Sequence, residues 1–263
     1  TLENVTVVAP PVAETSDTDH LTRYSAWLQA NPPRPAPIFN LRRQQGFVRE
    51  CHGDLHLGNI TFDKGRFCFF DCIEFNDELR WVDVVSELAF LAMDLQARGY
   101  KAFSRQLINR YFELTGDYAG AALLPYYLAY RAMVRAKVAM LRLPQAGNDG
   151  ARATLKKTCH DYLALAGYYV TRHSPALIIT HGLSGSGKST HTNALVRLIG
   201  AIRLRSDVER KRLFGSENSP ARDTSATSTD GGLYSASTTR ATYHHLLQKA
   251  LVLLDAGLPV IID

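Results

Sequence analysis

One short run, GLSGSGKST at residues 182–190, constrains the fold of this chain more than any other feature. It satisfies the pattern Gly-x-x-x-x-Gly-Lys-[Ser/Thr]. An apolar β-type run at 176–180 precedes it, and a helical pattern at 190–199 follows it. Glycines allow a backbone to wrap around a phosphate chain, so that successive N–H groups and a helix N-terminus face the anion. The order strand, loop and helix therefore predicts a Walker A phosphate-binding loop (P-loop) in an α/β domain.

Two side chains of this loop have expected roles. Lys188 would reach the outer phosphates, and the Ser189 hydroxyl would be a ligand of Mg²⁺. The sequence predicts a nucleotide, ATP with Mg²⁺, bound by Gly182, Ser184, Gly185, Ser186, Gly187, Lys188, Ser189 and Thr190.

A second motif, HGDLHLGN at residues 52–59, has the spacing His-x-Asp-x-x-x-x-Asn of a kinase catalytic loop. Phosphoryl transfer to an alcohol requires a carboxylate that accepts the hydroxyl proton, and Asp54 is placed for this role. Asn59 is a candidate metal ligand. A predicted hairpin at 60–70 then ends at Asp71, where a second metal ligand is expected.

Residues 52–59, followed by FFDCIEF at 69–75, resemble the aminoglycoside phosphotransferase and choline kinase-like family. Members of that family use His-Gly-Asp where protein kinases have His-Arg-Asp. The resemblance implies that Asp54 is the catalytic base and that Asn59 and Asp71 are metal ligands.

The resemblance extends over roughly residues 20–263, and it is close to one subfamily in which a P-loop kinase-like domain follows the phosphotransferase-like domain. Residues 206–211 and 260–263 are similar to small P-loop kinases. By that likeness, Asp207 and Asp263 act on metal, water or acceptor, and we predict both as metal ligands together with the loop serine.

Composition sets further limits. The chain has 263 residues, 46% hydrophobic and 21% charged, which is typical of globular proteins with about two domains. A net charge of +5 suits polyanionic ligands but is too diffuse to indicate nucleic acid. Without a long apolar run or a signal-peptide pattern, we expect no membrane insertion and a cytoplasmic location. The four cysteines are expected to be reduced and packed.

The expected fold class is α+β followed by α/β. We predict an irregular segment at 1–37 with one short helical stretch at 21–30, a mostly helical phosphotransferase-like domain (a kinase C-terminal lobe) at 38–174, and a P-loop parallel sheet with flanking helices at 175–263. Neither a glycine-rich loop nor a strand-borne lysine precedes the catalytic motif, and few strands follow the P-loop. We therefore expect an internal fragment of a longer protein.

Periodic apolar residues predict helices at 81–98, 101–114, 123–141 and 152–171. Asp83 would either tie the first of these helices to the catalytic loop or act as a charge at its N-terminus. Arg131 and Arg135 share a helical face. We expect that face to be solvated, with contact to an anionic group as the alternative.

Two classes of function fit these motifs. The first is an ATP-dependent phosphotransferase that acts on a hydroxyl of a small molecule, fused to a P-loop ATP-binding domain. The second is a regulatory or sensing module that binds nucleotide without small-molecule kinase activity. An intact set of Asp54, Asn59 and Asp71 favours the first, because pure binding would not need a base.

Overall fold

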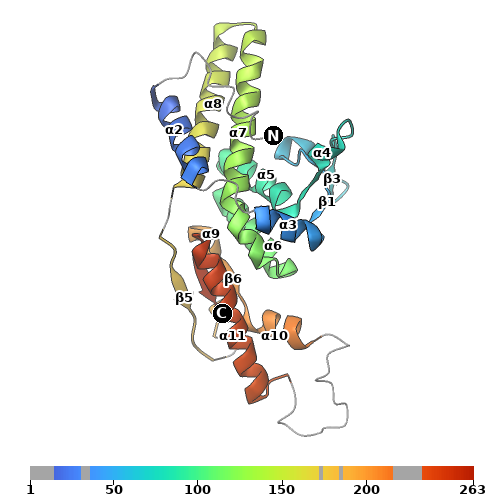
Figure 1. The fold of residues 1–263 in the computed structure, drawn as a ribbon, viewed down its shortest axis with the longest axis vertical. Coiled ribbons are helices and arrows are strands. Elements are labelled where there is room, and N and C mark those ends of the chain that lie inside the picture. Colours follow the sequence, from blue (N-terminus) through green and yellow to red (C-terminus); the bar gives the residue numbers. More distant parts are fainter. Residues whose placement is uncertain (1–14, 31–35, 172–173, 184–185, 216–232) are drawn as a thin grey trace. The chain divides into compact units, whose positions relative to one another are not determined.

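The computed structural model describes residues 15–30, 36–171, 174–183, 186–215 and 233–263. They form two compact units (Figure 1). Unit 1 comprises residues up to 104 together with 123–172, and unit 2 comprises 105–122 together with 173–263. Ser184, Gly185 and the polar stretch 216–232 lie outside the described residues.

Unit 1 is mainly helical. Its first helix, α2 (Thr15–Ala30), includes the short helical stretch predicted at 21–30 and begins six residues earlier. The elements that follow in this unit are α3 (Ala36–Gln44), β1 (Val48–Glu50), η1 (Leu57–Asn59), β2 (Ile60–Asp63), β3 (Arg66–Phe69), α4 (Asp77–Arg80), β4 (Trp81–Asp83), α5 (Val84–Ala97), the start of α6 (Lys101–Thr115), α7 (Leu124–Arg142), η3 (Leu143–Gln145) and α8 (Asp149–Val170). The rest of α6 and nearly all of η2 (Tyr118–Leu123) belong to unit 2.

Helices α7 and α8 run side by side and form the centre of this unit, with α5 and α2 packed against them (Figure 1). The buried face of α7 carries small residues at helical spacing, among them Ala132, Ala136 and Ala139. Residues three and four apart lie on one helical face, and small side chains there let two helices approach closely. The predicted helices in this region are confirmed, with boundaries shifted by a few residues.

Two small antiparallel sheets carry the segments around the catalytic motif. Strand β1 pairs with β4, with Glu50 opposite Trp81, and β2 pairs with β3 as the predicted hairpin. The predicted helix at 81–98 is therefore wrong at its start. Residues 81–83 are a strand because pairing with β1 overrides the helical apolar pattern that continues from Val84.

Asp83 is the N-cap of α5, where its carboxylate accepts a hydrogen bond from the Val85 N–H at 2.9 Å. It also forms a bidentate ion pair with Arg42 of α3, with distances of 2.6 and 2.9 Å. Both side chains are almost fully buried. Of the two roles considered for Asp83, the structure shows the charge at the helix N-terminus. The ion pair with α3 was not predicted.

Unit 2 contains a three-stranded parallel sheet in the order β5–β7–β6. Helices flank this sheet, so the predicted fold class of a helical domain followed by a P-loop sheet is confirmed. The elements are β5 (Leu177–Ile179), α9 (Lys188–Ile199), β6 (Ile202–Leu204), α10 (Ser206–Phe214), α11 (Ala236–Asp255) and β7 (Val260–Ile262).

A segment from earlier in the chain, residues 105–122, belongs to this second unit. The Asn109 side chain of α6 accepts a hydrogen bond from the backbone N–H of Arg203 in β6 at 2.7 Å. Buried Tyr118 donates to the buried carboxylate of Glu209 at 2.9 Å. Most of α6 and the turn after it are thus structural parts of the unit that carries the P-loop.

Cysteine packing differs from expectation. All four cysteines are free, but Cys68 and Cys72 are exposed. They lie on or beside β3, whose side chains are exposed throughout. None of the helices described is long and apolar enough to cross a bilayer.

The buried pair of Arg42 and Asp83 generates a stability prediction. Asp83→Asn retains a capping side chain but leaves the buried guanidinium without its counter-charge, so the free energy of unfolding should fall by about 3–5 kcal/mol. Urea denaturation measures it. As a control, Asp161→Asn breaks the exposed ion pair with Lys157 on α8 and should change stability by less than about 1 kcal/mol. Equal effects of the two substitutions would contradict the prediction.

Candidate functional site

The catalytic motif is held at Gly53, directly before Asp54. Gly53 has φ +83°, and a Cβ at this position would lie 2.9 Å from the Leu79 carbonyl oxygen, so only glycine fits. Its N–H donates to Glu87 of α5 at 3.1 Å, and its carbonyl accepts from Arg131 of α7 at 3.1 Å. Two helices therefore fix the peptide groups that orient Asp54.

The other end of the loop is fixed by the same helix. Fully buried Asp94 accepts a hydrogen bond from the Leu57 N–H at 2.9 Å. Glu87 and Asp94 are seven residues apart, which places them on one face of α5 about two turns apart. Sequence reasoning missed both. The available signal was a pair of acidic residues at this spacing within a strongly apolar helix.

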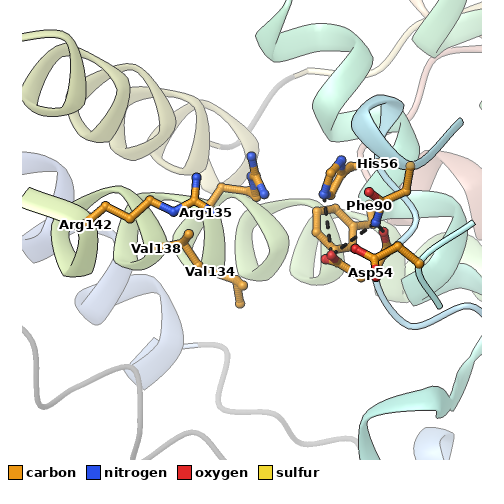
Figure 2. Close-up of a pocket in the computed structure, with 9 residues that line it drawn as sticks. Asp54, His56, Phe90, Val134, Arg135, Val138 and Arg142 are labelled. Atoms are coloured by element: carbon orange, nitrogen blue, oxygen red, sulfur yellow. Dashed lines mark hydrogen bonds and ion pairs between the residues drawn. The ribbon is translucent and has the colours of Figure 1, made fainter. Parts of the chain in front are cut away.

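Asp54, Asn59 and Asp71, which the sequence predicted as one catalytic set, line a single cavity of about 410 Å³ (Figure 2). The Asn59 amide nitrogen donates to the Asp54 backbone oxygen at 3.1 Å and to its carboxylate at 3.3 Å. The amide oxygen of Asn59 is then the atom of that group left for a cation. The cavity is lined by Asp54, His56, Asn59, Asp71, Phe90, Val134, Arg135, Val138 and Arg142.

An unusual backbone conformation positions Asp71 at the cavity. Its φ is +59°, in the left-handed region that aspartate tolerates better than most residues. Hydrogen bonds on both sides hold it there. The Phe70 N–H donates to the Asn59 carbonyl at 3.1 Å, and the Ile73 N–H donates to the His52 carbonyl at 3.0 Å. The hairpin end is thereby attached to the catalytic loop.

His56 is a site residue that sequence reasoning did not assign. Its Nδ1 accepts from the Gly58 N–H at 3.0 Å, which leaves the proton of the neutral ring on Nε2. That Nε2 lies 3.4 Å from the Asp54 carboxylate (Figure 2). Hydrogen bonding from His56 lowers the pKa of Asp54 below its usual range, although partial burial opposes the effect. Asp54 is therefore kept ionised and able to accept a proton.

The arginine face of α7 is not uniformly solvated, so this expectation is wrong for one residue. Arg131 is buried, hydrogen bonded to Gly53 and to the Ser86 hydroxyl, and its guanidinium lies 4.6 Å from the Phe90 ring centre. Burial lowers the pKa of Arg131. Arg135, one turn later, is half-buried and lines the cavity.

The P-loop turns at two glycines. Gly182 has φ +147°, and Gly187 has φ +81° as the N-cap of α9. Lys188 follows at the start of that helix. Its ammonium group donates to the Gly182 and Leu183 carbonyl oxygens at 2.7 Å each. The Lys188 side chain therefore lies across the loop that is predicted to bind the nucleotide phosphates.

Asp263 lies at the end of the central strand β7, beside the P-loop. Its carboxylate accepts from the Ser189 hydroxyl at 3.0 Å and from the Thr180 hydroxyl at 3.0 Å. The structure thus brings together two of the three predicted ligands of this site. Asp207 instead lies in the first turn of α10 and pairs with Arg205 at 3.1 Å, so its role as a metal ligand stays a prediction.

The oxygen atoms at both sites suit a hard divalent cation. Mg²⁺ takes one or two carboxylates and keeps water and phosphate oxygens as further ligands. Asp71 with Asn59, and Asp263 with Ser189, each offer one carboxylate and one neutral oxygen. Within the described ranges no group of three or more His, Cys, Asp or Glu side chains could hold a metal ion.

A helical unit with a kinase-type catalytic loop and a parallel sheet with a P-loop define a chain with two kinase-type domains. Comparison with family models agrees: residues 4–124 match the phosphotransferase enzyme family, and residues 177–263 match an AAA domain. The two matches come in the order that the sequence motifs predicted, with the phosphotransferase family first and the AAA domain second.

Relatives occur in mycobacteria. The uncharacterized proteins Rv2004c and MT2060 of Mycobacterium tuberculosis and Mb2027c of Mycobacterium bovis are each 34% identical to this chain over 231 residues. The match covers 86% of this chain and 44% of each relative, so the chain spans less than half of their length. No solved structure matches the chain significantly.

The contact between His56 and Asp54 generates a pKa prediction. His56→Ala removes the main cause that lowers the pKa of Asp54 while partial burial remains, so the Asp54 carboxyl should titrate at higher pH than in the parent protein. Carbon-13 NMR of aspartate-labelled protein measures both titrations, with Asp54 assigned by its loss in Asp54→Asn. His244→Ala, on α11 in the other unit, is the control. An unchanged Asp54 titration in His56→Ala would refute this cause.

Proposed function

We propose that the cavity around Asp54 transfers a phosphoryl group from ATP to a hydroxyl of a small molecule. Asp54 accepts the proton of that hydroxyl as the oxygen attacks phosphorus, and ADP leaves. Phosphoryl transfer passes through a loose transition state, so a protein contributes mainly positioning and charge. The matched phosphotransferase family domain supports this proposal.

The observation that carries the proposal is the restraint on Asp54. The backbone before it is fixed at Gly53, and its carboxylate contacts His56 and Asn59. A general base must be deprotonated and held within hydrogen-bond reach of the reacting hydroxyl. The lowered pKa of Asp54 meets the first condition, and the cavity that it lines gives an acceptor access to it.

Asp71 and the amide oxygen of Asn59 would hold Mg²⁺ in this site. When bound, the cation neutralises charge on the transferring phosphate. Asp71 has a left-handed backbone, and its neighbours Phe70 and Ile73 are hydrogen bonded to the catalytic loop, which keeps its carboxylate at the cavity that Asp54 lines. The two carboxylates thereby have separate roles, one as base and one as cation ligand.

The second unit supports a nucleotide site of its own. Backbone N–H groups at the start of α9 and the ammonium group of Lys188 would bind the phosphates, and Ser189 with Asp263 would hold the accompanying Mg²⁺. The same geometry also fits the alternative of a nucleotide-binding regulatory module. The two functions differ in whether Asp54 acts as the general base of a phosphoryl transfer.

Asp54→Asn tests that difference in the whole protein. The amide cannot accept the hydroxyl proton, so kcat should fall by about 100-fold or more, while KM for ATP changes little. ATP consumption with a panel of hydroxylated acceptors measures both constants. Asp63→Asn is the matched control, since Asp63 is exposed in the β2–β3 hairpin. Near-normal turnover of Asp54→Asn would exclude the base role and favour the regulatory module.

Lys188→Ala tests the P-loop. The substitution removes a charge-assisted contact to the outer phosphates worth about 1.5–3 kcal/mol, so Kd for Mg-ATP at this site should rise by about 10- to 100-fold. Isothermal titration measures it. Lys211→Ala, at an exposed position on α10, should bind as the parent protein does. Unchanged affinity in Lys188→Ala would show that the loop does not hold the phosphates.

A further inference from the structure

The cavity around Asp54 has an uneven distribution of charge. Its acidic groups, Asp54 and Asp71, belong to the catalytic loop and the end of the β2–β3 hairpin. The side formed by α7 carries two arginines, Arg135 and Arg142, and no acidic residue of α7 lines the cavity. In Figure 2 both arginines extend from α7 along one side, with Arg142 further from Asp54 than Arg135.

The two arginines differ in their terminal nitrogens, because Arg131 uses them in structural hydrogen bonds and none is recorded for Arg135 among the described residues, while the Nε of each is buried without a partner there. Arg131 uses its guanidinium to hold Gly53 and Ser86. The Nε of Arg135 is buried and has no hydrogen-bond partner in the part of the chain that the structure describes. The guanidinium carbon of Arg135 lies 5.9 Å from the centre of the Tyr162 ring. A buried donor without a partner is costly, so its presence at a cavity wall indicates a ligand.

Arg142 extends this basic side beyond the reacting group. It is seven residues after Arg135, which corresponds to about 10 Å along the helix axis. Val134 and Val138 line the cavity from the same helix and give this side an apolar floor. A ligand that lies along α7 would therefore meet apolar surface and two cationic groups.

We infer that the α7 side of the cavity binds an anionic group, a carboxylate or a phosphate, carried by the hydroxyl acceptor. This inference rests on the proposed function, because it assumes that the acceptor hydroxyl is directed at Asp54. Arginine recognises carboxylate and phosphate through two parallel N–H donors, and the Nε of Arg135 is one such donor that has no partner among the described residues. A polycationic acceptor would meet two like charges on the same side.

The competing role for Arg135 is contact with the phosphates of ATP. Those phosphates would meet the cation held by Asp71, which belongs to the end of the β2–β3 hairpin and not to α7. Arg142, two turns beyond Arg135, lies further still from the base (Figure 2). Two cationic side chains at increasing distance from Asp54 are better placed to bind an anionic substituent of the acceptor than to bind the phosphoryl group that is transferred. Kinetic constants for the two substrates separate the roles.

The first experiment measures binding without turnover, in the whole protein without Mg²⁺. L-tartrate is an anionic diol, and L-threitol is its neutral counterpart. At constant ionic strength, tartrate should shift the nitrogen-15 signal of Arg135 Nε in a saturable way, and threitol should leave it unchanged. Loss of the signal in Arg135→Gln provides the assignment. Arg142→Gln should weaken tartrate binding, whereas Lys157→Gln, exposed on α8, should not. Equal shifts with both diols, or none, would overturn the inference.

The second experiment compares acceptors in ATP-consumption assays: D-gluconate with D-glucose, D-glycerate with glycerol, and kanamycin as a polycation. The anionic member of a pair should have a kcat/KM at least about tenfold higher, and Arg135→Gln should abolish that preference while KM for ATP is unchanged. Arg135→Lys, which keeps the positive charge, should retain part of the preference for the anionic acceptor.

The outcomes separate the two proposals. Turnover that depends on Asp54 but prefers a neutral or cationic acceptor overturns the inference and leaves the proposed function standing. A raised KM for ATP in Arg135→Gln, with the acceptor preference intact, also overturns it. If Asp54→Asn removes no activity with any acceptor, the proposed function fails, and the tartrate titration alone decides whether the α7 side binds anions.

Discussion

The position of one peptide segment at Gly53 governs the geometry of the phosphotransferase site. Its N–H is bound by Glu87 and its carbonyl by Arg131, so α5 and α7 both contact the residue before the candidate base. The left-handed conformation and the lack of space for a Cβ make this arrangement specific to glycine. Helix packing thus determines where the Asp54 carboxylate lies, and a shift of α5 against α7 would move it.

Spacing along the chain predicted the parts of the site that are local in sequence. Asp54, Asn59 and Asp71 are joined by a short loop and a hairpin, and the structure places them around one cavity. Likewise, the order of strands in the parallel sheet brings Asp263 to Ser189 although 74 residues separate them, because β7 lies next to β5. The likeness to small P-loop kinases was enough to select Asp263.

Partners that depend on packing between distant helices could not be predicted in this way. Arg131 is 78 residues from Gly53, and periodicity alone placed it on a solvated face. The same limit explains the error at Trp81, whose strand partner Glu50 lies on a separate element. His56 was a different case: it lies two residues from Asp54, but its role became apparent only when the ring orientation and its contact with the Gly58 N–H were known.

Helix α6 gives the second unit a discontinuous chain. Residues 105–122 are separated from residue 173 by α7 and α8, yet Tyr118 and Glu209 are hydrogen bonded in its interior. During synthesis, α6 emerges from the ribosome well before its sheet exists. Tyr118 and the apolar side of α6 therefore lack their packing partners in unit 2 until β6 and α10 have been synthesised. The order of translation therefore makes the P-loop unit complete later than unit 1, and a chaperone that binds nascent apolar surface would find α6 before the sheet that it packs against has been made.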